Sequence, residues 1–314
     1  MLAHHVLTLT ANPALDLSAE VEKIEPIHKL RCTAPRRDPG GGGINVARVI
    51  RRLGGEVSAV FPIGGMTGAL LEALMRAEHI HCVPVPISGE TREDFTVRER
   101  ASNRQYRFVM PGPELTAREL TQCLDALHSA ETGSDFVVAS GSLPPGAGPD
   151  FYARIARGAK AHGRKLIVDT SGAALKAALD EGVWLAKPNL RELREFSGKP
   201  LPEDGDWLAA VREIVAQGGA HVVALSLAEK GARLVTRDEV WAAHAPPIAP
   251  VSTVGAGDSF VGGLTWALAR DASLPDALRH AVAAGTAALL SHGTELCHAE
   301  AVHRLLPDVV VEQM

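Results

Sequence analysis

The chain has 314 residues, of which 46% are hydrophobic and 22% are charged, the profile of an ordinary globular protein with a sizeable core. Its 37 Asp and Glu residues outnumber 32 Lys and Arg residues, so no basic excess is present to neutralise a nucleic acid backbone. The N-terminus lacks a signal-peptide pattern, and no apolar run approaches the ~18 residues of a membrane-spanning helix. We therefore expect a cytoplasmic protein that binds neither nucleic acid nor membrane.

Cysteine and histidine spacing gives no sign of a metal site. The four cysteines are far apart and form no CxxC pair, which argues against both a disulfide framework and a zinc ribbon. None of the thirteen histidines lies in an HExxH pattern. We expect buried or incidental thiols and ordinary surface or core histidines.

Apolar β-rich runs alternate with helical patterns through most of the chain. In chain order, strands are predicted at 6–10, 57–63, 135–140, 165–170, 183–187 and 221–226. Helices are predicted at 44–53, 67–79, 116–130 and 150–163, and the last part of the chain predicts helices at 256–270, 274–290 and 298–305. This alternation indicates an α/β protein with a buried, mainly parallel sheet and helices on both faces.

Two segments instead alternate polar and apolar residues with period two. Residues 17–24 and 92–109 predict half-exposed strands of a small antiparallel sheet outside the parallel core. Phe95 would share one face with Val97, and that apolar face requires a cover. We expect a single domain, 1–314, with a small β lid formed from about 14–37 and 88–112 that closes over a site or joins two subunits.

The stretch PGGGGINVAR, 39–48, contains four consecutive glycines before a predicted helix. Such a run is costly in backbone entropy and indicates close approach of a ligand or of another backbone. It matches neither a Walker A loop nor a GxGxxG dinucleotide motif with an acid about twenty residues later. Asn45, near the start of the helix, has an amide suited to sugar hydroxyls.

The stretch TVGAGDSF, 253–260, also leads into an apolar helix. A helix N-terminus exposes unpaired N–H groups, and the glycines allow an anion to approach them. Asp258 would lie in the first turn beside that anion, where a carboxylate can take the proton of an entering alcohol. The pair predicts phosphoryl transfer. The alternative is a tight turn followed by a favourable helix charge of about 0.3–1 kcal/mol.

GGGGINVA, KPN at 187–189 and TVGAGDSF, in this order, resemble the PfkB family of ribokinase-like sugar kinases over essentially the whole chain. LTLTANPALD, QYRFVMPG and SGSLPPG are most similar to its minor bacterial 6-phosphofructokinase branch. The resemblance implies a three-layer α/β/α core with a β lid. It also implies ATP-dependent phosphorylation of the C1 hydroxyl of fructose 6-phosphate, which yields fructose 1,6-bisphosphate and ADP.

The same resemblance implies roles for single residues. Asp258 would be the proton acceptor, and the amides of Gly255, Ala256 and Gly257 would bind the migrating phosphoryl group. Arginine suits phosphate because its guanidinium group binds two oxygens at once. The residues expected to bind the sugar phosphate are Asp16, Lys29, Gly41, Gly42, Asn45, Arg92, Arg107 and Ser140.

On the nucleotide side, the resemblance implies contacts to ATP from Lys187, Asn189, Ser226, Gly231 and Thr253. Asn189 and Glu192 would hold Mg²⁺ through water, in keeping with the reluctance of Mg²⁺ to lose its waters. Read without the family, the same pair is a helix cap and a first-turn acid. The sequence departs from the family at Ala228, where a glycine is usual.

Several alternatives stay open at this stage. Kinases of tagatose 6-phosphate and of fructose 1-phosphate share most of these residues. A non-catalytic sensor of nucleotide or sugar phosphate would have the same fold. Potassium binding near Ser252 and Val254 is an open question, since Ser291 and Glu295 do not match the related pattern. The apolar lid face leads us to expect a homodimer.

Overall fold

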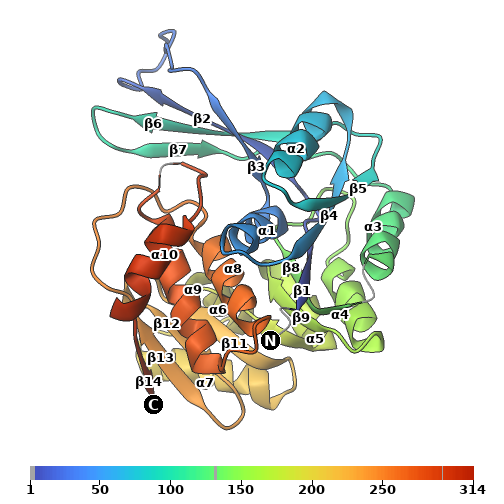
Figure 1. Cartoon of the computed structure of the whole chain (residues 1–314), viewed down its shortest axis with the longest axis vertical. Coiled ribbons are helices and arrows are strands. Elements are labelled where there is room, and N and C mark those ends of the chain that lie inside the picture. Colours follow the sequence, from blue (N-terminus) through green and yellow to red (C-terminus); the bar gives the residue numbers. More distant parts are fainter. Residues whose placement is uncertain (1–3, 131–132, 292) are drawn as a thin grey trace.

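The structure, a computed structural model, describes residues 4–130, 133–291 and 293–314. In these ranges a ten-stranded sheet lies between two layers of helices, and a separate four-stranded sheet stands at one end of the molecule (Figure 1). The predicted α/β class, with a mainly parallel sheet and helices on both faces, is confirmed.

Seven neighbouring strands of the large sheet, from β11 to β5, are parallel, and the last three pair antiparallel at one edge. The parallel strands alternate along the chain with the helices that connect them. From one edge to the other the order is β14 (Val310–Gln313), β13 (Val240–His244), β12 (Ala232–Val235), β11 (Ala220–Ser226), β10 (Val183–Ala186), β9 (Lys165–Asp169), β8 (Ser134–Ser140), β1 (His5–Leu9), β4 (Val57–Ile63) and β5 (His81–Pro86).

Each face of the sheet has its own buried apolar cluster beneath its own helices. One face is covered by α1 (Gly42–Arg52), α2 (Gly65–Ala77), α8 (Ala256–Leu268), α9 (Leu274–Ala288) and α10 (Ala299–Leu305). The other face is covered by α3 (Ala117–Ser129), α4 (Phe151–Ala161), α5 (Gly172–Glu181), α6 (Leu190–Ser197) and α7 (Asp204–Ala216). Short 3₁₀ turns are η1 (Ala228–Lys230) and η2 (Leu306–Asp308).

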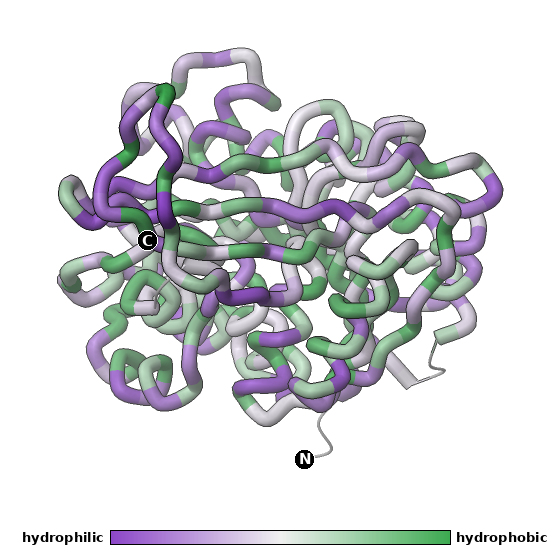
Figure 2. Tube along the Cα trace, turned by 90° about the horizontal axis from the view of Figure 1, so that it is seen from above, coloured by the Kyte–Doolittle hydropathy of each residue, from purple (hydrophilic) through white to green (hydrophobic). Residues whose placement is uncertain are grey.

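Burial on both faces explains the uninterrupted apolar strands. In β8, Val137 belongs to the cluster on one face and its neighbour Val138 to the cluster on the other. Burying each side chain contributes about 1.5–3 kcal/mol, so both neighbours favour this strand. Figure 2 shows hydrophobic and hydrophilic residues mixed along the chain. Helix α3 is an amphipathic example, since Leu120, Leu124 and Leu127 are buried while Thr121 and Gln122 are exposed.

The predicted core elements are observed with ends shifted by no more than two residues, and the strand predicted at 57–63 is β4. Four strands of the large sheet were not predicted: β5, β12, β13 and β14. β5 and β14 are the two edges of the sheet. β5 contains Pro84 and Pro86, which an edge strand tolerates but which weaken a strand pattern in the sequence.

The small sheet has the order β3 (Arg36–Gly40), β2 (Ala14–Val21), β6 (Arg92–Glu99) and β7 (Gln105–Phe108). The prediction that it is wholly antiparallel is wrong, because its two central strands, β2 and β6, are parallel. The chain passes through α1, β4, α2 and β5 between these strands, and this crossover returns it in the same direction. The outer pairs, β2 with β3 and β6 with β7, are antiparallel.

The two faces of the small sheet have different environments. Asp94 and Thr96 of β6 are buried, whereas Phe95 between them is 39% exposed. Phe95 lies opposite Phe108 of β7, which is 51% exposed, so the outward face carries adjacent aromatic rings. We call the outward residues Leu17, Ala19, Phe95, Val97, Tyr106 and Phe108 the apolar lid face.

Candidate active site

The candidate site lies where several strands of the large sheet end. The order of the sheet reverses at β1, since the chain next adds β4 on one side and β8 on the other. Ligands of open α/β sheets bind beyond the carboxyl ends of the strands at such a reversal. Ser140, Asp169 and Ser226 are the last residues of β8, β9 and β11, so their side chains lie at this edge.

The N-terminus of α8 supplies the backbone donors. Gly255 is its N-cap, with a left-handed φ of 74°, and Asp258 lies in the first turn. The first N–H groups of a helix have no partner within it, and the helix dipole adds a partial positive charge. The turn at Gly255, Ala256 and Gly257 therefore presents an anion site directly beside a carboxylate.

α1 brings the glycine-rich stretch to the same place. Gly41 is the N-cap of α1, with φ 108°, and a Cβ added at Gly42 would stand 2.3 Å from Ser140 Oγ. α1 and α8 pack closely, since a Cβ at Gly262 would lie 2.5 Å from Val49 Cγ1. The two helices therefore lie against each other near their middles.

A hydrogen bond between the first turns of these helices joins two predicted site residues. Asn45 Nδ2 donates a hydrogen bond of 2.8 Å to Asp258 Oδ2 across 213 positions of sequence. The amide oxygen Oδ1 of Asn45 is buried and has no protein partner within the described ranges. Buried polar atoms normally have a partner, so this oxygen is available to a substrate hydroxyl.

The electrostatic surroundings prepare Asp258 for proton transfer. Burial, followed by the negative charge of Asp169, raises the pKa of Asp258 to about 6, although Asn45 and Lys187 act in the opposite direction. Lys187 Nζ lies 3.0 Å from Asp169 Oδ1 and is buried. A general base works best when its pKa is close to the working pH, and Asp258 approaches that condition.

Asp16 faces the same region from the lid. In the register of the small sheet it lies between Asp38 of β3 and Asp94 of β6. Burial, followed by the charge of Asp94, raises the pKa of Asp16 to about 7, and Arg107 and Arg48 partly oppose this. Asp38 accepts from Arg36 and Thr294, and Asp94 accepts from Met110 N, so of the three carboxyl groups Asp16 is the one suited to recognition of a hydroxyl group.

The predicted phosphate-binding cations have different positions. Arg92 donates to the carbonyl oxygens of Met110 (2.6 Å) and Asn12 (3.0 Å), while its buried Nε has no protein partner in the described ranges. Arg107 pairs with Thr96, on the lid face that carries Asp16. Lys29 is exposed in the loop between β2 and β3, and no contact joins it to the site residues of its own chain.

The predicted magnesium residues form a helix cap. Asn189 Oδ1 accepts from the Glu192 N–H, and Glu192 Oε2 accepts from the Asn189 N–H, both at 2.9 Å. Ser226 N donates to Pro188 O (3.0 Å), so this cap lies beside the end of β11. The sequence-based interpretation of the pair as a cap is confirmed, and Oε1 of Glu192 is left for another contact.

The predicted nucleotide turn holds Ala228 in a conformation that favours glycine. Ala228 adopts φ 52°, the left-handed conformation that glycine would adopt more readily, at a cost of about 1–2 kcal/mol. Gly231 has φ 80°, and a Cβ there would stand 2.0 Å from Ala243 O, so a packing constraint requires this glycine. Thr253 is exposed just before α8.

Two residues of the site were missed in the sequence. Asp169 accepts from Ser140 Oγ at 3.5 Å and pairs with Lys187, and Asn12 donates to Pro111 O at 2.9 Å. Both follow or end a predicted strand, at 165–170 and 6–10, and a polar residue at the carboxyl end of a parallel strand is the signal that would have found them.

Comparison with known proteins identifies the family. The family model described as "pfkB family carbohydrate kinase" matches residues 9–301. The chain belongs to the pfkB family of carbohydrate kinases. It is therefore a sugar kinase, and the glycine-rich stretch and the α8 turn described above are parts of a pfkB family domain.

Three curated pfkB relatives carry activity names. The "ATP-dependent 6-phosphofructokinase isozyme 2" of Mycobacterium tuberculosis is 47% identical over 95% of this chain and 88% of its own length. The protein of the same name from Escherichia coli is 44% identical over 93% and 94%. A "1-phosphofructokinase" of Xanthomonas campestris is 36% identical over 85% of each chain.

Solved structures of Escherichia coli phosphofructokinase-2 have the same fold. One complex contains potassium (42% identity, TM-score 0.93) and one contains fructose-6-phosphate (41%, TM-score 0.92). A third is described as the tetrameric inhibited form (42%, TM-score 0.92). Each comparison covers 97% of this chain and 99% of the other. The prediction of a ribokinase-like α/β/α core is thus confirmed.

Proposed function

We propose that this sugar kinase transfers the γ-phosphoryl group of ATP to the C1 hydroxyl of fructose 6-phosphate. The observation that carries the proposal is the Asp258 carboxylate, held by Asn45 beside the α8 amides. The names of the two most similar relatives reported above support the choice of substrate.

The reaction needs a base, a site for the moving charge and a fixed acceptor. Asp258 takes the proton as the hydroxyl oxygen attacks phosphorus, a role typically worth about 10²–10⁴-fold in rate. The amides of Gly255, Ala256 and Gly257 stabilise the negative charge on the phosphoryl oxygens. Lys187, whose Nζ would lie 3.5 Å from a Cβ at Gly257, adds a positive charge at the same turn.

On the sugar side, hydroxyl groups bind to Asp16 and to Oδ1 of Asn45, and the backbone at Gly41 and Gly42 lets the ring approach. Ser140 contributes its hydroxyl to the same pocket, since its Oγ lies next to Gly42. Arg92 and Arg107 bind the existing phosphate, supported by the unpartnered Nε of Arg92 and by the inward position of Arg107. Lys29 is exposed in the loop between β2 and β3, away from the site residues of its own chain. In this proposal it therefore binds the sugar phosphate in the site of a second chain.

ATP binds along the edge marked by Lys187, Asn189, Ser226, Gly231 and Thr253, with Mg²⁺. The donor set fits magnesium, because Oε1 of Glu192 and the amide of Asn189 suit the water shell that Mg²⁺ retains. Mg²⁺ supplies positive charge to the phosphates when it is bound. Asn189 and Glu192 would hold the ion through its water shell.

We also propose a monovalent-cation site beside the α8 turn. The Escherichia coli complex with potassium supports this proposal. Here Ser252 Oγ lies 3.4 Å from Gly293 O, so the two segments predicted to form the site are in contact. Turnover in K⁺ compared with tetramethylammonium at equal ionic strength tests it. Equal rates would contradict it.

The lid, formed from about 14–37 and 88–112, serves both as a cover of the sugar and as a homodimer contact in this proposal. The exposed apolar lid face supports this assembly. We further place the protein in the cytoplasm, a choice supported by its four free cysteines, which suit a reducing compartment.

A substrate panel tests the proposed specificity. We expect the highest kcat/KM with fructose 6-phosphate when MgATP is the donor. Preference for fructose 1-phosphate or tagatose 6-phosphate would establish a kinase of that substrate instead. The 1-phosphofructokinase relative supports including fructose 1-phosphate in the panel. Nucleotide binding without turnover of any sugar phosphate would establish a sensor. The presence of Asp258 between two intact glycine turns disfavours that outcome.

A further inference from the structure

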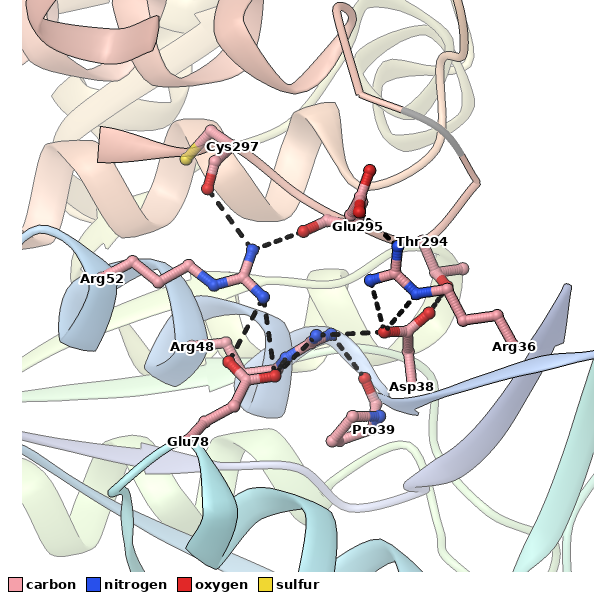
Figure 3. Close-up of polar contacts among 9 residues, drawn as sticks. All are labelled: Arg36, Asp38, Pro39, Arg48, Arg52, Glu78, Thr294, Glu295 and Cys297. Atoms are coloured by element: carbon pink, nitrogen blue, oxygen red, sulfur yellow. Dashed lines mark hydrogen bonds and ion pairs between the residues drawn. The ribbon is translucent and has the colours of Figure 1, made fainter. Parts of the chain in front are cut away.

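A network of charged side chains lies between the lid, α1 and the segment before α10 (Figure 3). It balances three arginines against three carboxylates. Arg48, only 1% exposed, donates to Glu78 and to Pro39 O, each at 2.8 Å. The charged members are Arg36, Asp38, Arg48, Arg52, Glu78 and Glu295.

Arg52 uses both ends of its guanidinium group. Nη1 donates to the backbone carbonyls of Glu295 and Cys297, the latter at 3.4 Å. Nη2 contacts the Glu78 carboxylate at 3.3 and 3.5 Å, which orients the group (Figure 3). One planar side chain thus holds the two carbonyls that flank Leu296.

Leu296 has an unusual conformation for its residue type. Its φ is 62°, in the left-handed region, which costs a side chain of this size about 1–2 kcal/mol. Such a conformation persists only where neighbouring contacts impose it. The two carbonyls bound by Arg52 belong to Glu295 and Cys297, the residues on either side of Leu296, so they provide that restraint.

The side chain of Leu296 packs against the α8 turn. It is 1% exposed, and its Cδ2 lies 2.5 Å from the place where a Cβ on Gly255 would stand. Gly255 begins the run of amides assigned above to the moving phosphoryl group. A shift of Leu296 therefore moves, or frees, the backbone of that turn.

We propose that Arg52 is a positioning residue for phosphoryl transfer, which holds Leu296 left-handed and thereby fixes the amides of the α8 turn. The inference rests on the proposed role of that turn. Two further contacts tie the same segment to the lid: Thr294 Oγ1 donates to Asp38 Oδ2 at 2.9 Å, and Arg36 pairs with Glu295. Arg52 thus binds a segment that contacts both the lid strand β3 and the α8 turn.

The positioning role predicts a selective loss of kcat. A shift of about 1 Å in catalytic groups lowers rates by about 10²-fold. We expect Arg52→Met to lower kcat by at least tenfold and to change KM for ATP and for the sugar phosphate by less than threefold. Arg52→Lys keeps the charge but loses the two-ended geometry, and we expect an intermediate kcat. Added guanidinium should partly restore Arg52→Met.

The adjacent Arg51→Met is the matched control, because Arg51 is on the same helix and pairs only with Glu56 at the surface among the contacts described. It should keep its kcat. A purely structural Arg52 would lower the melting temperature of Arg52→Met without lowering kcat of the folded enzyme, and that result would overturn the inference. The inference would also be overturned if Arg52→Met lost kcat and neither added guanidinium nor the Arg52→Lys substitution restored any of it.

Asp258→Asn, assayed in parallel, separates this inference from the proposed function. If Asp258→Asn loses turnover while Arg52→Met keeps it, only the role of Arg52 is rejected. If Asp258→Asn keeps wild-type turnover, the proposed chemistry at the α8 turn is rejected, and the role of Arg52 is rejected with it.

Discussion

At the residue scale, the same carboxylate position occurs at the start of two helices with different surroundings. Asp258 is in the first turn of α8 and Asp276 is in the first turn of α9. Asp276 accepts from Ser273 and Arg279 at the surface, whereas Asp258 lies among Asn45, Lys187 and Asp169. Only the environment of Asp258 supports a general base, since a position in the first turn by itself stabilises a carboxylate by about 0.3–1 kcal/mol.

Asp258→Asn should therefore lower kcat by about 10²-fold or more, because the amide cannot accept the proton. Sugar-phosphate and ATP affinity, measured by calorimetry, should stay within a few-fold of wild type. Asp276→Asn is the control and should leave kcat unchanged. Wild-type kcat in Asp258→Asn would remove this residue from the role of base.

The raised pKa of Asp258, about 6, sets a pH dependence. The base is ionised above this pH and protonated below it, so kcat should fall as the pH drops through about 6. Lys187 lowers the pKa of Asp258, so Lys187→Met should move this acid limb to higher pH. The measurement is kcat against pH at saturating substrates. The surface variant Lys176→Met should show the wild-type limb, and an unmoved limb in Lys187→Met would contradict the assignment.

At the element scale, the α8 turn depends on its backbone conformation and on its neighbour. Gly255 has φ 74°, and an added Cβ would meet Leu296, whereas Gly54 has φ 80° with nothing within 4 Å of such a Cβ. Both substitutions by alanine pay the left-handed penalty of about 1–2 kcal/mol. Only Gly255→Ala also collides with a buried side chain.

Gly255→Ala should thus lower stability by more than Gly54→Ala and should also lower kcat by at least tenfold, because the amide donors are displaced. Urea unfolding and steady-state kinetics on both variants give the two readings. If both variants lose equal stability and Gly255→Ala keeps its kcat, the conformation of this turn does not matter to the reaction.

At the scale of the whole molecule, the apolar lid face has no cover within the described chain. Phe95 and Phe108 are adjacent and exposed, and an apolar surface of this kind commonly marks an interface. The related Escherichia coli enzyme is described in a tetrameric inhibited form, so assembly of subunits occurs in a relative. A dimer through two lid faces is the simplest closed arrangement.

Phe95→Asp should convert the proposed dimer into a monomer at micromolar concentration, because a charge would be buried in the contact. Sedimentation velocity measures the change. Met66→Asp is the control, since Met66 is an exposed apolar residue on α2, outside the lid, and its replacement should leave the mass unchanged. A wild-type protein that is already monomeric would end this proposal.

The sequence determined what depends on neighbours along the chain. Hydrophobic periodicity located most of the core elements within two residues, and the glycines before an apolar helix placed Asp258 in its first turn, because helix starts and strand burial are local in origin. It also identified the family. Contacts between distant segments were beyond this kind of pattern.

Only the tertiary structure decided the parallel pairing of β2 with β6, the bond from Asn45 to Asp258, and the position of Asp169 beside Lys187. The same holds for Arg52, whose two carbonyl partners, Glu295 and Cys297, lie more than 240 positions away. A pKa or a strained backbone depends on which groups become neighbours after folding, and local periodicity carries no record of that pairing.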